Sequence, residues 1–378
     1  TLAVSINGLL KGQLKYLNNY FDVIAVSGGD EYLKQIADRE EVLIRDIKMS
    51  RQINIYLDLI SLYKLILLFR KENPQIVHSI TPKAGLLSML AARFTRVPIR
   101  MHTFTGLIFP SKKGLFQKIL ILMDRLLCAC STSVYPEGEG VKNDLIKYRI
   151  TDKPLRVIGN GNVNGIDTHF FQPDSISESE KKRIRQKYEI QQEDFVFVFV
   201  GRLVKDKGIN ELVAAFKAVQ TKYQHPKLLL VGPFEKDLDP LFPETMQEIK
   251  KNPAIIAVGL QKDVRPYFAV SHCLAFPSYR EGFPNVPMQA GALGLPSIVT
   301  DINGCNEIIT HEQNGLIIPP KSKETLEKAM LRILEEPKLT NKLAGKAREC
   351  IISRFEQMTL WKQIKAEYDR QLKQAGIM

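Results

Sequence analysis

The sequence predicts an α/β protein made of two doubly wound, Rossmann-like domains, and three observations support that prediction. At 378 residues the chain exceeds what one hydrophobic core usually supports. Short apolar runs alternate with longer segments of helical periodicity, as in the strand-helix units of a parallel sheet. The alternation pauses at a Gly/Asn-rich loop at 159–165 and restarts at 195–200, so we expect the two halves to join near 160–190.

In the first half of the chain, strands and helices alternate less regularly than in the second half. Strands are expected at 2–6, 23–26, 76–78, 99–102, 132–135 and 155–158. Helices are expected at 10–18, 84–92 and 113–129. The order alternates as a doubly wound fold requires.

The second half opens on the clearest strand of the chain. Its continuous β-branched and aromatic residues indicate a strand buried on both faces. Strands are expected at 195–200, 227–231, 255–258, 273–276, 297–299 and 316–318, and helices at 177–188, 208–222, 284–293 and 356–375. Sheets of this kind bind ligands at the carboxyl ends of their strands, so two facing sheets are expected to form an interdomain cleft.

Composition restricts the class of protein. The net charge is +12, of which residues 1–170 carry +8 and the remainder +4, which suggests an anionic partner for the first half. No run of 18 uncharged apolar residues and no cleaved-signal pattern is present, so we expect no membrane-spanning helix. Five cysteines without metal or disulfide spacing indicate reduced thiols in a cytoplasmic protein.

A basic turn follows the strand at 195–200. Arg202 and Lys207 lie between Gly201 and Gly208, directly before an expected helix. Two cations at the carboxyl end of a buried strand can neutralise a diphosphate, Arg through its planar fork and Lys as a point charge. The P-loop spacing is absent. Taken alone, such a turn is also compatible with solvated surface.

A second turn opens the expected helix at 284–293. Pro284 and Pro287 suit the first turn of a helix, so amides near Asn285 and Val286 should point outward with partial positive charge. A phosphate can bind at such a helix end.

Two polar side chains flank this helix start. Glu281 precedes it and can accept hydrogen bonds from two sugar hydroxyls, while Gln289 lies one turn further in and can bond a ribose. The alternatives are an ordinary turn carboxylate for Glu281 and an ordinary helix-face amide for Gln289.

Four motifs in order give a family resemblance. They are G-R-L-V-K-D-K-G at 201–208, F-P-S-Y-R-E-G-F-P-N-V-P-M-Q-A at 276–290, G-L-P-S-I-V-T-D at 294–301 and N-G-L-I-I-P-P at 314–320. From about residue 76 to the end, the chain resembles retaining glycosyltransferases of family 4 with the GT-B fold. It resembles more closely bacterial enzymes that extend sugars on a polyprenyl-diphosphate carrier in capsule, O-antigen or protein-glycan synthesis.

The resemblance implies a donor site. Arg202 and Lys207 would contact the diphosphate of a nucleotide sugar, most simply a UDP-sugar, and Glu281 would hold hydroxyls of the transferred sugar. The remaining donor-site residues would be Gly201, Gly282, Phe283, Pro284, Asn285 and Val286. The family has a glutamate that binds ribose where this chain has Gln289. The implied reaction is front-face retention, with no resident cofactor and no metal.

The resemblance also implies a domain layout. Residues 1–165 would form the acceptor-side domain and residues 166–355 the nucleotide-sugar domain. Residues 356–378 would form a helix that crosses back onto the first domain.

Candidates on the acceptor side are less well defined. His102 or His78 could supply a polar group near the anomeric carbon, although either could equally be a core histidine. Relatives often have a histidine where this chain has Thr105. Asn164 and Asp167, in a segment similar to the family's N-G-[VI]-D, would line the cleft.

A basic, apolar helix is expected near 113–129. Lys112, Lys113 and Lys118 accompany Leu115 and Phe116, among other apolar residues, a composition suited to an anionic bilayer surface. We therefore expect a cytoplasmic protein peripherally bound to the inner membrane face, acting on a lipid-linked saccharide. An ordinary buried helix with one wet face remains the alternative.

Other functions fit the sequence less well. Asp237 and Asp239 form a D-x-D pair, which binds metal mainly in the other large glycosyltransferase fold. A sugar-nucleotide epimerase of related fold is disfavoured by the motif set. A nucleic-acid-binding protein is disfavoured by the lack of an aromatic-plus-basic RNA motif or a zinc framework, so nucleic acid is not expected as a partner.

Overall fold

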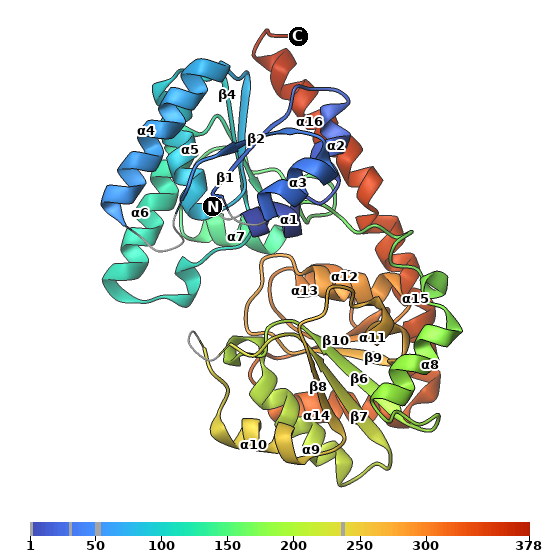
Figure 1. Cartoon of the computed structure of the whole chain (residues 1–378). Helices are drawn as coiled ribbons and strands as arrows, with labels where there is room; N and C mark the ends of the chain where they lie inside the picture. The colour runs from blue at the N-terminus through green and yellow to red at the C-terminus, as the bar shows by residue number, and fades with distance from the viewer. Residues whose placement is uncertain (1–2, 30–31, 50–53, 236–238) are drawn as a thin grey trace. The chain divides into compact units, whose positions relative to one another are not determined.

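The structure is a computed structural model that describes residues 3–29, 32–49, 54–235 and 239–378. The chain forms two compact units (Figure 1). Thr1–Gly165 together with Gln357–Met378 make up the first unit, and Ile166–Glu356 make up the second. Both units are α/β with parallel sheets, as the sequence predicts.

The second unit contains a six-stranded parallel sheet in the order β11-β10-β9-β6-β7-β8. The strands are β6 (Phe195–Val200), β7 (Pro226–Val231), β8 (Ile255–Gly259), β9 (Cys273–Phe276), β10 (Ser297–Thr300) and β11 (Gly315–Ile318). Its helices are α8 (Glu178–Lys187), α9 (Ile209–Gln220), α10 (Pro243–Lys251), α11 (Arg265–Ala269), α12 (Asn285–Ala292), α13 (Cys305–Ile308), α14 (Lys323–Glu335) and α15 (Pro337–Phe355).

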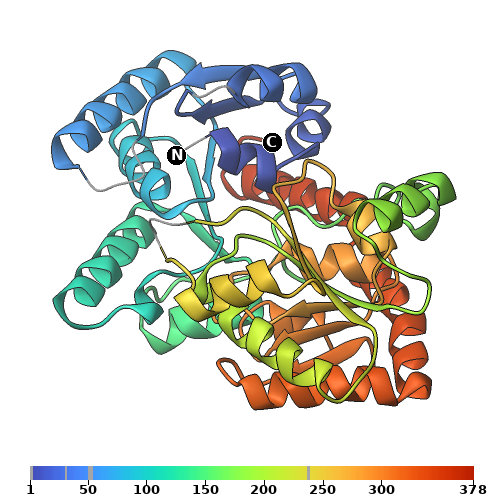
Figure 2. The same ribbon diagram turned by 60° about the horizontal axis from the view of Figure 1, so that its bottom comes forward.

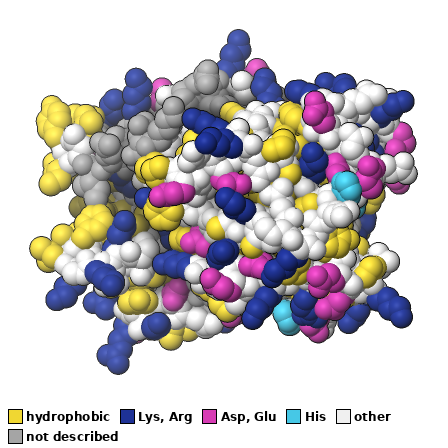
Figure 3. Space-filling model, turned by 90° about the horizontal axis from the view of Figure 1, so that it is seen from below, with side chains coloured by type: hydrophobic (Ala, Val, Ile, Leu, Met, Phe, Trp, Pro, Cys, Tyr) yellow, Lys and Arg dark blue, Asp and Glu magenta, His cyan; other side chains and the backbone are white. Residues whose placement is uncertain are grey.

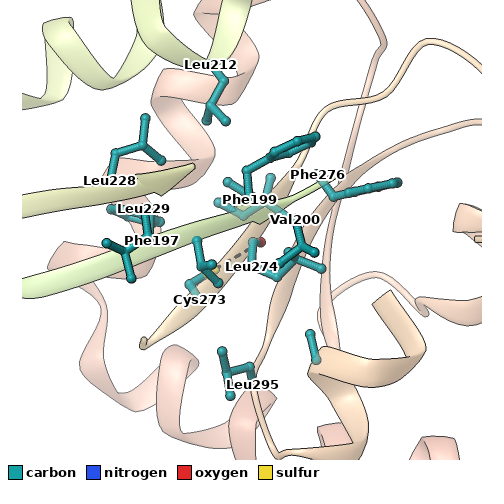
Figure 4. Packing of buried hydrophobic residues seen from close by; sticks show 14 of the residues in the cluster. Phe197, Phe199, Val200, Leu212, Leu228, Leu229, Cys273, Leu274, Phe276 and Leu295 are labelled. Carbon is teal, nitrogen blue, oxygen red and sulfur yellow. Dashed lines mark hydrogen bonds between the residues drawn. The ribbon is translucent and has the colours of Figure 1, made fainter. Parts of the chain in front are cut away.

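The core of the second unit is built around β6. Five of the six residues of this strand are buried, so its side chains fill both faces of the sheet. Figure 4 shows Phe197 and Phe199 of β6 among Leu228 of β7 and Leu274 of β9. The strand is thus the rigid centre from which the loops at its carboxyl end project.

Strand order places a topological switch next to β6. The chain runs outward from β6 to β7 and β8, then returns to the other side of β6 as β9 and continues outward to β10 and β11. The loops after β6 and β9 therefore begin side by side and diverge. Doubly wound sheets bind ligands at this point.

The first unit has two separate parallel sheets among its described residues. Strands β1 (Ile24–Ser27) and β2 (Leu43–Asp46) pair with each other, and β3 (Ile76–Ser79), β4 (Ile99–Phe104) and β5 (Ser133–Pro136) form the second sheet. The helices are α1 (Ala3–Leu9), α2 (Gln13–Asn18), α3 (Tyr32–Glu40), α4 (Ile55–Glu72), α5 (Pro82–Phe94), α6 (Gly114–Cys130), α7 (Glu139–Lys147) and α16 (Gln357–Gln374). A cavity of about 1570 Å³ is lined by residues of both sheets and of α2 and α16.

Helices cover both faces of the three-stranded sheet. Helices α4 and α6 pack on either side of α5, which contacts β3 and β4 (Figure 2). Helix α16 covers the opposite face, where Leu372 packs on Ile99 and Met101. There the Tyr135 hydroxyl donates to Glu367 Oε1 at 2.6 Å.

Two strand predictions in the first half were wrong. Residues 3–9 form helix α1 rather than a strand, because a short apolar run without periodicity does not separate the two states. Leu155 makes only a single bridge to Val134, and residues 156–158 belong to no strand. Strand β2 was missed because its residues are only partly buried and show no clean alternation.

Other predictions held. The remaining predicted strands and helices appear with ends shifted by a few residues. All five cysteines are free thiols. Among the helices that the structure describes, none combines the length and the apolar character needed to cross a membrane.

Candidate active site

Two loops meet at the switch point of the second unit. One follows β6 and contains Gly201 to Gly208, and the other follows β9 and leads into α12. The Tyr279 backbone N–H donates to the Asp206 carbonyl at 2.8 Å, which joins the loops. Gly208 has a φ of 72°, and a Cβ there would lie 2.1 Å from the Pro277 carbonyl oxygen. A glycine is therefore required for this close approach.

The loops carry a cation and a carboxylate that pair. Lys207 Nζ forms an ion pair with Glu281 Oε1, and the two side chains are only 17% and 14% exposed. The Lys207 ammonium also lies 5.8 Å from the centre of the Phe276 ring, at the end of β9. The two residues that the sequence assigned to different motifs thus lie in direct contact.

Arg202 is paired to a carboxylate that the sequence did not single out. Arg202 Nη1 donates to Glu235 Oε2 at 2.6 Å, and the arginine remains 41% exposed. Glu235 lies in the loop after β7, the other neighbour of β6 in the sheet. No sequence signal marks Glu235, because only the strand order of the sheet brings the two loops together.

A third ion pair joins the loop after β6 to the loop after β9. Arg280 Nη2 donates to Asp206 Oδ2 at 3.0 Å, and both side chains are partly exposed. The sequence reasoning missed both residues, although they lie inside the quoted motifs. Arg280 therefore adds a third cation beside Lys207 and Arg202.

Helix α12 begins at the expected position. Pro284, in extended conformation, is its N-cap residue, and Asn285 is the first helical residue. Phe283 is buried in the core of the unit and packs edge-on against Phe355. Gly304 lies so close that a Cβ there would meet the Gly282 carbonyl at 2.4 Å. The segment before the helix is thereby fixed by packing from both sides.

The remaining positions of this helix are only partly enclosed. Val286 and Gln289 are both half-buried on α12. Among the residues that the structure describes, no hydrogen bond of the Gln289 amide side chain is found. Its predicted role at a ribose stays a prediction.

A buried thiol, that of Cys305, lies near Glu281. Cys305 is fully buried at the start of α13, and this burial, with a contribution from Glu281, raises the pKa of its thiol well above the ordinary value. A protonated, enclosed thiol is a poor nucleophile.

The aspartates considered for metal binding are only partly described. Asp237 lies outside the described residues. Asp239 Oδ2 accepts the Asp206 backbone N–H at 2.7 Å, so it supports the β6 loop. Within the described ranges, no cluster of three or more His, Cys, Asp or Glu side chains is arranged to hold a metal ion.

In the first unit, His102 lies in the core. Its side chain is 0% exposed, and its Nδ1 lies 2.8 Å from the Ser79 hydroxyl. Burial, with a smaller effect of His78, lowers the pKa of His102 to about 3. This geometry favours the core-histidine alternative over a role at a reacting carbon.

His78 and Thr105 are held by neighbouring groups of the same unit. The ring nitrogens of His78 lie 2.7 Å from the Tyr368 hydroxyl and 2.8 Å from the Thr103 hydroxyl. Burial lowers the pKa of His78 to about 4, so the ring is neutral at pH 7. The Thr105 hydroxyl donates to the Ile80 carbonyl at 2.8 Å.

Asn164 and Asp167 fall in different units and have structural partners. Asn164 Oδ1 accepts from the Trp361 indole N–H at 2.8 Å, and its amide donates to the Lys11 carbonyl. Asp167 Oδ1 accepts the backbone N–H groups of His169 and Phe170. Asn164 thus stabilises the packing of α16 and Asp167 a local turn, and their predicted place at the cleft stays a prediction.

Sequence comparisons place the chain in a family. The family model "Glycosyltransferase Family 4" matches residues 9–168, and the model "Glycosyl transferases group 1" matches residues 180–350. The capsular polysaccharide biosynthesis glycosyltransferase CapM of Staphylococcus aureus is 32% identical over 375 residues, which cover 97% of this chain and 95% of the relative. The chain belongs to the glycosyltransferases. This confirms the predicted family and enzyme class and gives no support to the epimerase and nucleic-acid alternatives.

A further relative and two solved structures agree with this family and with the predicted fold. An Escherichia coli enzyme described as UDP-Gal:alpha-D-GlcNAc-diphosphoundecaprenol alpha-1,3-galactosyltransferase is 28% identical and covers 85% of this chain and 81% of its own length. Among solved structures, Anabaena Alr3699/HepE in complex with UDP has a TM-score of 0.80 at 18% identity, covering 97% of both chains. WaaG, a glycosyltransferase of lipopolysaccharide biosynthesis, has a TM-score of 0.70 at 14% identity over 93% of both chains. The predicted GT-B fold is confirmed.

Proposed function

We propose that this glycosyltransferase moves a sugar from a UDP-sugar to a saccharide carried on polyprenyl diphosphate, in the synthesis of a surface polysaccharide. The observation that carries the proposal is the pairing of Lys207 with Glu281 at the switch point of the second unit. The names of two relatives support the proposed acceptor and product. One relative acts in capsule biosynthesis, and the other acts on a diphosphoundecaprenol-linked sugar.

The residues of the two loops have separate roles in this proposal. Lys207, Arg202 and the amides at the start of α12 neutralise the donor diphosphate, and the Glu281 carboxylate accepts hydrogen bonds from the transferred sugar. The bond between the anomeric carbon and the β-phosphate oxygen breaks while a bond to the acceptor oxygen forms on the same face. The acceptor proton passes to the leaving phosphate. Stabilising the charge on that phosphate supplies most of the rate enhancement.

The first unit supplies the acceptor side in this proposal. Helix α6 exposes Leu115, Ile119 and Leu122, and Lys113 and Lys118 are exposed at its beginning. This arrangement is suited to an anionic bilayer, where a lipid-linked acceptor resides. Peripheral attachment at the cytoplasmic face of the membrane accords with the excess positive charge of residues 1–170.

The donor assignment is tested by thermal unfolding with a panel of UDP- and GDP-sugars. A UDP-sugar at about 100 times its Kd should stabilise the protein by about 2.7 kcal/mol, and the Glu281→Ala variant should lose most of that gain. Stabilisation by GDP-sugars alone would overturn the choice of nucleotide. Equal stabilisation of the wild type and Glu281→Ala would overturn the site.

A further inference from the structure

Helix α4 is apolar on nearly all sides, although it lies at the surface. Its inner side chains Leu65 and Phe69 are buried against the core of the first unit. Seven further large apolar side chains of the helix are exposed, and they are Ile55, Tyr56, Leu57, Leu59, Ile60, Tyr63 and Leu67. A helix that is apolar all round is normally buried or in contact with lipid.

The exposed residues form one stripe. Tyr56, Leu59, Ile60, Tyr63 and Leu67 follow the spacing i, i+3, i+4, i+7 and i+11 and fall within an arc of about 100° on an α-helix. Their exposed fractions range from 36% for Ile60 to 73% for Tyr56. We call these five residues the α4 stripe. It faces away from the side chains that pack on the core.

A second stripe runs along α6. Leu115, Ile119, Leu122 and Leu126 follow the spacing i, i+4, i+7 and i+11, and each is at least 43% exposed. Because α5 packs against both α4 and α6, the two stripes belong to one helical layer. Figure 3 shows hydrophobic side chains gathered along its left edge, the side on which Figures 1 and 2 place α4 and α6, with Lys and Arg beside them.

Basic side chains mark the end of the α4 stripe. Arg70 and Lys71, in the last turn of the helix, are both exposed, and Lys64 is exposed beside the stripe. Asp58, near the start, is not free to repel an anionic surface, because Lys83 of α5 pairs with it at 2.6 Å. The exposed charge next to the stripe is therefore positive.

We propose that the α4 stripe inserts into the hydrocarbon boundary of a lipid bilayer and so provides a second, hydrophobic membrane contact beside basic α6. This rests on the proposed function, in which the acceptor is lipid-linked. The α4 contact depends on apolar burial and is insensitive to salt, whereas the attraction of the α6 lysines for anionic lipid is screened.

The chemistry of the stripe favours a bilayer over a second copy of the chain. Two of its five residues are tyrosines, whose amphipathic rings suit the headgroup level of a membrane. A contact between two copies over the stripe would enclose Lys64, Arg70 and Lys71 at the interface, and burying charges without a paired carboxylate is unfavourable. An anionic bilayer instead attracts these cations.

Vesicle sedimentation of the full chain tests the proposal. The probes are phosphatidylcholine vesicles with and without phosphatidylglycerol, at low salt and at about 1 M salt, where the Debye length is about 3 Å. Wild type should bind both vesicle types in high salt. The double variant Leu59→Ser/Leu67→Ser, which changes no charge, should lose that binding by about tenfold or more.

Matched variants make the result specific. Leu260→Ser/Ile352→Ser removes two exposed apolar side chains from the second unit and should bind like wild type. Lys112→Gln/Lys113→Gln/Lys118→Gln should lose only the additional binding that anionic vesicles show at low salt, and it should keep the salt-resistant part. Circular dichroism checks that each variant is folded.

Three outcomes would overturn the proposal. One is unchanged high-salt binding of Leu59→Ser/Leu67→Ser, and another is an equal loss in the second-unit control. The third is a change only in oligomeric state by analytical ultracentrifugation, which would make the stripe a contact between copies. Sugar transfer to a short-chain, water-soluble acceptor separates this proposal from the proposed function. The stripe variant should retain that transfer, because it needs no membrane contact. A wild-type protein that shows no such transfer would count against the proposed function alone.

Discussion

The two units place their apolar side chains differently. Of the 23 large hydrophobic side chains that are exposed among the described residues, 19 belong to the first unit and four to the second. The second unit has one continuous six-stranded sheet, while the first has two separate sheets. Apolar residues in the second unit thus serve mainly the core, whereas many in the first face outward. A surface role is therefore best sought in the first unit and chemistry in the second.

The largest effect should come from the centre of the second unit. Phe197→Ala removes a fully buried ring from β6 and should lower the free energy of unfolding by about 3–5 kcal/mol. The equivalent truncation on the outer face of the first unit, Leu67→Ala, should change it by less than about 0.5 kcal/mol. Urea unfolding measures both. Comparable losses would mean that the exposed stripe is packed in solution.

The next largest effect concerns activity. Glu281→Ala removes the carboxylate that pairs with Lys207 and should lower kcat/KM by about 100-fold or more, with the fold retained. Steady-state transfer from a UDP-sugar measures it. Glu178→Ala, which truncates a highly exposed carboxylate of the same unit, is the control. Unchanged turnover of Glu281→Ala would place the chemistry elsewhere.

Acid should remove the stabilisation that neutral His78 and His102 give to the first unit, whereas the Asp124 carboxyl, whose pKa is raised to about 7 by burial, acts in the opposite direction. His78 and His102, with pKa values lowered to about 4 and about 3, bind protons more readily when unfolded, where the ordinary value is 6.5. Their stabilisation is complete above pH 6.5 and is lost as the pH falls towards 4, on the order of 2 kcal/mol for His78 between pH 7.5 and 5.

Hydrogen exchange at pH 7.5 and 5 locates this loss. In an Asp124→Asn background, which removes the opposing group, protection should fall in β3 and β4 as the pH is lowered. His78→Gln should reduce the pH dependence of the first unit. A uniform loss over both units would contradict the assignment to these histidines.

The smallest effect is expected at the more exposed cation. Arg202→Ala should raise the KM for the donor about tenfold with a smaller change in kcat, because Arg202 is 41% exposed and Lys207 only 17%. Arg202→Lys should recover part of the affinity, since it keeps the charge but not the planar fork. A drop in kcat as large as that of Glu281→Ala would give both residues the same role.

Local patterns predicted the second unit well and the first less well. The run of apolar residues in β6 and the motifs on either side of it led to the strands and to Lys207 and Glu281. The contact between Arg202 and Glu235 could not be predicted, because it joins loops 33 residues apart through the strand order of the sheet.

The first unit was harder to predict for two physical reasons. The sequence marks His102 as polar after a strand, but only packing determines that its ring points into the core. Helix α4 has apolar residues on both its inner and outer faces, so its hydrophobic pattern did not distinguish core from surface.

The three ion pairs in the loops after β6, β7 and β9 determine how an anion can bind to these loops. Lys207, Arg202 and Arg280 each have a carboxylate partner already in place. An anion that binds there exchanges partners with these carboxylates instead of meeting bare positive charge. Such an exchange releases a loop carboxylate for every cation engaged, so arrival of the anion and rearrangement of the loops become a single coupled event.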